Sequence, residues 1–147
     1  MNVGKIVAVA GPVVDVEFEP GTLPRIREAL TVEVNGRQCV MEVAQQIGGD
    51  TVRCIMLAQS EYLARGMKAV ATGSGIRVPV GECTLGRMFN ALGTAIDGGE
   101  PIPEDAERWP IHRKAPAFAE QKPTVDILET GIKVIDLLEP YPKGGKI

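Results

Sequence analysis

The last residues of the chain come closest to a known chemical motif. A phosphate-binding loop requires Gly-x-x-x-x-Gly-Lys-Ser/Thr, so that backbone N–H groups surround the phosphates and the Lys reaches the β- and γ-phosphates. Here Gly145 and Lys146 are followed by Ile147, and Pro140 stands at the position of the first Gly. Because the motif fails at both ends, we interpret residues 127–147 as the segment that precedes such a loop.

Two other groups with chemical potential do not form a complete motif. Gly73-Ser74-Gly75 is followed by Val78 where a dinucleotide-binding loop needs its third Gly, and it lacks the flanking glycines of a nucleophile elbow. We therefore predict a tight turn. His112 is the only histidine, which excludes a multi-histidine metal site. A catalytic triad with Ser60 or Ser74 has no local support, so we expect a surface or hydrogen-bonded structural histidine.

The remaining polar and sulfur groups favour structural roles. An acidic cluster on a proline-rich loop is predicted to be solvated, and consists of Glu104, Asp105 and Glu107. Trp109 is expected to pack this loop onto its domain. The cysteines are odd in number without C-x-x-C spacing, which favours buried free thiols in a reducing compartment, and they are Cys39, Cys54 and Cys83. We predict no catalytic, cofactor-binding or metal-ligating residue in the chain.

Composition restricts the class of protein. A chain of 147 residues and 15.7 kDa has room for one domain, or for one small domain and part of another. Its net charge of −3 lacks the basic excess of a nucleic-acid binder. No apolar run approaches the ~20 residues of a membrane span, and no signal-peptide pattern is present. We expect a protein made in a bacterial-type cytoplasm.

The first half of the sequence predicts a small β-barrel. Apolar residues alternate with polar ones at Val14, Val16 and Phe18, which is typical of a half-buried strand. Asn35-Gly36 is a strong hairpin signal. The predicted strands cover residues 5–9, 14–18, 30–34, 39–43, 51–58 and 68–71. A ligand-binding barrel of the OB type would need an aromatic and basic face, which is missing, so a structural or assembly barrel is favoured.

The second half has a different pattern. Apolar residues at positions 85, 88, 89 and 92 predict a helix over residues 82–92, ended by Gly93. Five prolines exclude a regular helix or a central strand from residues 97–123. A second helix is predicted over residues 130–138, with Thr130 as N-cap, followed by a turn that leads into a strand. The predicted domains are therefore a barrel over residues 1–75 and a second region over residues 76–147.

These residues resemble one family closely, the β subunit of F-type ATP synthase, over essentially the whole chain. The barrel segment Gly11-Pro12-Val13-Val14-Asp15-Val16-Glu17-Phe18 is similar to its opening strands. The run Val78-Pro79-Val80-Gly81 is similar to the start of its nucleotide-binding domain. The run Gly131-Ile132-Lys133-Val134-Ile135-Asp136 is similar to the stretch before its phosphate-binding loop. The segment Glu107-Arg108-Trp109-Pro110-Ile111-His112-Arg113, together with the Gly131–Asp136 run, points to catalytic β specifically, whereas single pieces are shared with α, vacuolar-type and flagellar or secretion ATPase subunits.

The resemblance implies an all-β barrel of about six strands followed by the incomplete start of an α/β RecA-like domain. It also implies a catalytic subunit that makes ATP from ADP and phosphate, driven by a transmembrane proton gradient. ATP or ADP and Mg would be its ligands in the full-length subunit. Its partners would be α subunits in an alternating ring and a central-shaft subunit, at the cytoplasmic face of the bacterial plasma membrane. The phosphate-binding loop would lie beyond Ile147, so we expect the 147-residue chain to be inactive and to bind no nucleotide.

Two alternatives remain open from the sequence. One is a non-catalytic barrel module that docks into an oligomeric ring. The other is a related rotary or secretion ATPase, which the tryptophan–histidine segment disfavours.

Overall fold

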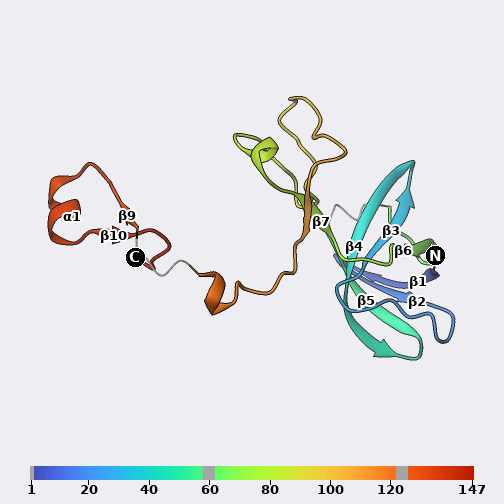
Figure 1. Cartoon of the computed structure of the whole chain (residues 1–147). Coiled ribbons are helices and arrows are strands. Elements are labelled where there is room, and N and C mark those ends of the chain that lie inside the picture. The colour runs from blue at the N-terminus through green and yellow to red at the C-terminus, as the bar shows by residue number, and fades with distance from the viewer. Residues whose placement is uncertain (1, 58–61, 122–125) are drawn as a thin grey trace. The chain divides into compact units, whose positions relative to one another are not determined.

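The structure is a computed structural model that describes residues 2–57, 62–121 and 126–147 (Figure 1). The chain divides into two compact units, Met1–Arg113 and Lys114–Ile147. The first unit contains the barrel and the loops that follow it. The second contains the short elements at the C-terminal end of the sequence.

Six antiparallel strands close into a barrel in the first unit (Figure 1). The strands are β1 (Val3–Ala10), β2 (Val13–Glu17), β3 (Ala29–Val34), β4 (Arg37–Gly48), β5 (Thr51–Met56) and β6 (Lys68–Ala71). Their order is β1-β2-β5-β4-β3-β6, and β6 pairs again with β1. Closure leaves no unpaired sheet edge on which another strand could add. The predicted six-strand barrel is confirmed.

Alternation along each strand builds the barrel core. Val14 and Val16 of β2 are fully buried, and Asp15 between them faces outward to Arg53. The core consists mainly of Val, Leu, Ile, Met and Ala side chains, as the low aromatic content predicts. Its members are Ile6, Val14, Val16, Phe18, Leu30, Val32, Val34, Met41, Val43, Val52, Cys54, Met56, Ala69 and Ala71.

Two predicted turns form as expected. Asn35 and Gly36 have φ of 50° and 75°, the left-handed conformations that a two-residue hairpin between β3 and β4 requires. Gly48, Gly49 and Asp50 also have positive φ, between β4 and β5. The strand predicted over residues 51–58 ends at Met56 in the structure, and its last predicted residue lies outside the described residues.

The helix predicted over residues 82–92 is wrong. Only a single 3₁₀ turn, η1 (Glu82–Thr84), forms there. Leu85 has the extended ψ of 134° and Gly86 has φ of 69°, which stop the helix. The apolar spacing therefore does not build a helical face, and Leu85 is 68% exposed. The chain instead forms a looped excursion between β7 (Arg77–Pro79) and its antiparallel partner β8 (Arg108–Pro110).

The second unit contains η2 (Phe118–Glu120), the strand pair β9 (Ile127–Leu128) and β10 (Tyr141–Pro142), and the helix α1 (Lys133–Leu138). The second predicted helix thus exists but begins later than Thr130, since Gly131 has φ of 78° and lies outside the helical region. No strand follows Pro142 in the described residues. Little helix follows the barrel, and the RecA-like start remains a proposal.

Candidate functional site

A pocket of about 310 Å³ lies at one end of the barrel, where three segments meet. Residues 25–28 supply one wall, the turn of residues 73–76 supplies a second, and Pro110 with His112 supplies the third. The 25–28 segment precedes β3, the turn follows β6, and the third wall belongs to and follows β8. The barrel therefore positions two of the three walls, and the β7–β8 ribbon positions the last.

Glu28 braces two of these walls. Its Oε1 accepts the backbone N–H of Gly73 at 2.9 Å, and its Oε2 accepts the backbone N–H of Arg25 at 2.9 Å. The turn is tight, as predicted: the Oγ1 of Thr72 donates to the Ser74 carbonyl at 2.9 Å. A Cβ at Gly75 would lie 3.1 Å from the Arg27 carbonyl oxygen, so a bare glycine allows the two walls to approach closely.

His112 fixes the third wall to the barrel. Its Nε2 lies 3.0 Å and 2.9 Å from the two carboxylate oxygens of Glu42 on β4, seventy residues away in sequence. The predicted hydrogen-bonded structural role of His112 is confirmed. Ser74 lines the same pocket, but no hydrogen bond joins it to His112 in the described residues, so no triad is assembled. Ser60, the other triad candidate, lies outside the described residues.

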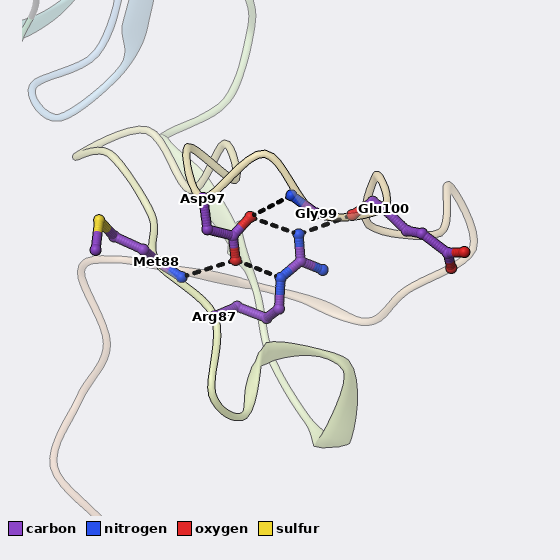
Figure 2. Close-up of polar contacts among 5 residues, drawn as sticks. All are labelled: Arg87, Met88, Asp97, Gly99 and Glu100. Atoms are coloured by element: carbon purple, nitrogen blue, oxygen red, sulfur yellow. Dashed lines mark hydrogen bonds and ion pairs between the residues drawn. The ribbon is translucent and has the colours of Figure 1, made fainter.

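The loop between β7 and β8 is organised around a bidentate ion pair (Figure 2). Arg87 Nε and Nη2 donate to the Asp97 carboxylate at 2.5 and 2.8 Å, and Nη2 also donates to the Glu100 carbonyl at 2.8 Å. The backbone N–H groups of Met88 and Gly99 also donate hydrogen bonds to the Asp97 carboxylate. The hydrogen bonds from Arg87 are the main cause that lowers the pKa of Asp97. Every oxygen of this carboxylate is occupied, so the cluster is structural.

Trp109 and the acidic loop also form structural contacts. The Trp109 Nε1 donates to Glu107 at 2.6 Å, and the Arg113 guanidinium stacks 3.6 Å above the indole centroid. Trp109 remains 41% exposed, so it lies against its own loop rather than in the barrel core. Within the part of the chain that the structure describes, no three His, Cys, Asp or Glu side chains are placed to hold a metal.

The C-terminal unit holds a second buttressed carboxylate. Asp136 accepts hydrogen bonds from the Thr130 backbone and hydroxyl at 3.0 and 2.7 Å and from Gly131 N–H at 3.0 Å, and the Thr130 hydroxyl is the main cause of its lowered pKa. Thr130 is therefore linked to α1 by its hydrogen bonds to Asp136, but it is not the N-cap of that helix. Ile132 occupies that position.

Sulfur and membrane-related features add no site. Cys54 is fully buried, Cys39 and Cys83 are partly buried, and all three are free thiols, of which only Cys54 meets the expectation of burial. None of the helices in the described ranges is long and apolar enough to cross a membrane. Sequence reasoning missed the pocket, because its walls come from segments that carry no motif and that only the barrel brings together.

The fold defines a small, closed antiparallel β-barrel domain. Residues 6–73 match the family described as "ATP synthase alpha/beta family, beta-barrel domain". The barrel of this chain is therefore similar to the β-barrel domains of the ATP synthase alpha/beta family, a family that includes catalytic ATP synthase subunits. The match does not distinguish alpha from beta.

Proposed function

We propose that the chain is the N-terminal part of a catalytic β subunit of a rotary F-type ATP synthase. In this function, residues 1–75 are the assembly barrel, and residues 76–147 are the first part of a RecA-like ATPase domain. The observation that carries the proposal is the closed barrel with its family match over residues 6–73. The choice of β over α rests on the Glu107–Arg113 segment together with the Gly131–Asp136 run, whose sequences resemble the β subunit.

The partners follow from this assignment. The barrel would join a hexameric ring of alternating α and β subunits, with the central shaft inside the ring. The complete subunit would bind Mg with ATP or ADP and would make ATP from a proton gradient, at the cytoplasmic face of a bacterial plasma membrane. The exposed apolar residues on the outer barrel surface, which include Val9 (37% exposed) and Ile55 (46% exposed), are compatible with lateral contact between neighbours.

A non-catalytic barrel module is the second candidate. It is favoured by the barrel core, whose fourteen described members all come from residues 6–71. Both candidates require the barrel to enter a ring. They differ in whether catalytic activity depends on residues that follow this segment in the gene.

The experiment that tests the proposal is reconstitution. The 147-residue chain is mixed with purified α subunits of a bacterial F-type ATP synthase, and complexes are measured by native mass spectrometry. Incorporation beside α, in competition with full-length β, supports the proposal. Failure to compete with β at any ratio, or incorporation only in place of α, would overturn it. A reading frame that continues into a Gly-rich loop ending in Gly-Lys-Thr separates the catalytic subunit from the module.

Calorimetry with Mg-ATP tests the accompanying expectation that the chain alone binds no nucleotide. Micromolar, Mg-dependent binding would contradict that expectation without bearing on ring assembly.

A further inference from the structure

The pocket at the barrel end is lined in part by residues whose side-chain hydrogen-bond donors have no acceptor within the described residues. Arg25 and Arg27 are among its lining residues, and within the described residues neither side chain makes an ion pair or a hydrogen bond. Ser74 adds a hydroxyl to the same lining. Two unpaired guanidinium groups on residues that line one cavity favour an acceptor-rich ligand.

Glu28, the one carboxylate among the described lining residues, does not neutralise these donors directly. Glu28 already receives one backbone N–H on each of its oxygens, from Gly73 and Arg25. The lining thus carries two guanidinium charges against one carboxylate that is already hydrogen-bonded on both oxygens. An anion entering the pocket would meet a net positive lining in which the guanidinium groups remain unpaired.

The wall formed by residues 25–28 contains a residue with a strained backbone. Arg27 has φ of 70°, a left-handed conformation that is uncommon for a residue with a side chain. The barrel enforces it, since the Arg27 N–H donates to the Val43 carbonyl on β4 at 2.8 Å. Strained residues held by their surroundings occur often at ligand-binding positions. The hydrogen bond to Val43 thus holds the Arg27 backbone in this conformation beside the pocket.

The other part of the lining is apolar. Ile76 is 6% exposed, whereas Ile26 is 55% exposed and Pro110 is exposed. The volume of about 310 Å³ lies at the lower end of the range for small-molecule sites. Room therefore exists for a small organic group beside the anion.

We propose that this pocket binds a small organic oxyanion, a phosphate ester or a carboxylate, through Arg25 and Arg27, with the organic part against Ile76 and Pro110. The contact between His112 and Glu42 holds the Pro110 wall in position, so His112 acts here as a positioning residue. The site lies on the barrel and its adjoining ribbon and contains no part of the segment that resembles the approach to a phosphate-binding loop.

The test is a titration of the ¹⁵N-labelled 147-residue chain, followed by amide chemical shifts, with inorganic phosphate, phenyl phosphate and benzoate as probes. We expect saturable shifts at residues 25–28 and 73–76, with half-saturation at about 10 mM or below. Phenyl phosphate should bind more tightly than inorganic phosphate because it also contacts the apolar wall. Tighter binding of phenyl phosphate than of benzoate identifies phosphate as the preferred group, and the reverse order identifies carboxylate.

Matched variants decide whether the pocket is the site. Arg27→Gln should weaken binding about tenfold, because a charge-assisted hydrogen bond is lost. Arg37→Gln removes an exposed charge at the β3–β4 hairpin, outside the pocket, and should leave binding unchanged. If Arg27→Gln disturbs the fold, wild-type competition by chloride provides the second measurement, since binding must weaken as salt rises. Linear, non-saturating shifts, or equal loss in both variants, would overturn the proposal.

Discussion

Gly4 lies in β1 where the barrel leaves no room for a side chain. A Cβ at this position would stand 2.7 Å from Val16 Cγ1, 2.8 Å from the Glu17 carbonyl oxygen and 2.8 Å from Phe18 Cζ. Carbon atoms in good contact lie about 3.5–4.0 Å apart, so Gly4→Ala overlaps three atoms at once. The Glu17 oxygen belongs to β2, which pairs with β1, and cannot retreat without moving that strand.

The expected cost of Gly4→Ala follows from two opposing terms. Overpacking of a filled core costs about 1–3 kcal/mol. Replacing Gly by Ala returns about 0.4–1 kcal/mol by restricting the unfolded chain. We expect a net loss of about 1–2 kcal/mol, which lowers the Tm of a domain of this size by about 5–15 °C.

Differential scanning calorimetry of the purified chain measures this loss. Val3→Ala is the matched control, since the neighbouring Val3 is 48% exposed and its truncation should change stability by no more than about 0.5 kcal/mol. The double variant Gly4→Ala/Val16→Ala should lose less stability than the sum of its single variants, because removal of Cγ1 relieves the overlap. A Tm for Gly4→Ala at or above that of the wild type would refute the packing argument.

Three further perturbations test other parts of the barrel. Leu30→Ala removes a fully buried side chain and should cost about 2–5 kcal/mol by urea unfolding; a loss below about 1 kcal/mol would contradict the assigned core. The hydrogen bonds from Arg53 lower the pKa of Asp15 in the folded protein. The stabilisation that they contribute to the fold is therefore fully present above the ordinary carboxyl pKa, and it is lost as the pH falls through the lowered pKa of Asp15. The stability difference between wild type and Asp15→Asn, at most about 1 kcal/mol for so exposed a pair, should therefore shrink below about pH 4, and a constant difference would refute the assignment. Burial raises the pKa of Cys54 to about 12, so iodoacetamide at neutral pH should alkylate the partly buried Cys39 well before Cys54, as peptide mass spectrometry would show; equal rates would contradict the burial of Cys54.

Local pattern was sufficient for the barrel strands and insufficient for the segment after them. Val14 and Val16 show their burial through alternation alone, and Asn35-Gly36 determines its own turn. The apolar spacing that includes Leu85 and Met88 has the same regularity, yet it forms no helix. Gly86 adopts a left-handed φ, and the Arg87–Asp97 pair links residues ten apart in sequence, which helical propensity does not take into account.

The candidate pocket could not be found from the sequence. Its walls come from residues 25–28, from residues 73–76 and from Pro110 with His112, and no spacing rule connects them. The contact between His112 and Glu42 spans seventy residues in the same way. Only pairing of β3 with β4 and β6 brings the first two walls together.

The sequence by itself determined the strands, their inward faces, the hairpin turns and the resemblance to an ATP synthase subunit, because each depends on residues that are near neighbours along the chain. Tertiary structure alone decided the closure of β6 onto β1, the crowding at Gly4 and the convergence of Arg25 and Arg27 with His112. These features depend on contacts between distant segments. Such contacts form because a closed sheet buries its apolar face and pairs both of its edges, a condition that no single strand of the barrel can satisfy.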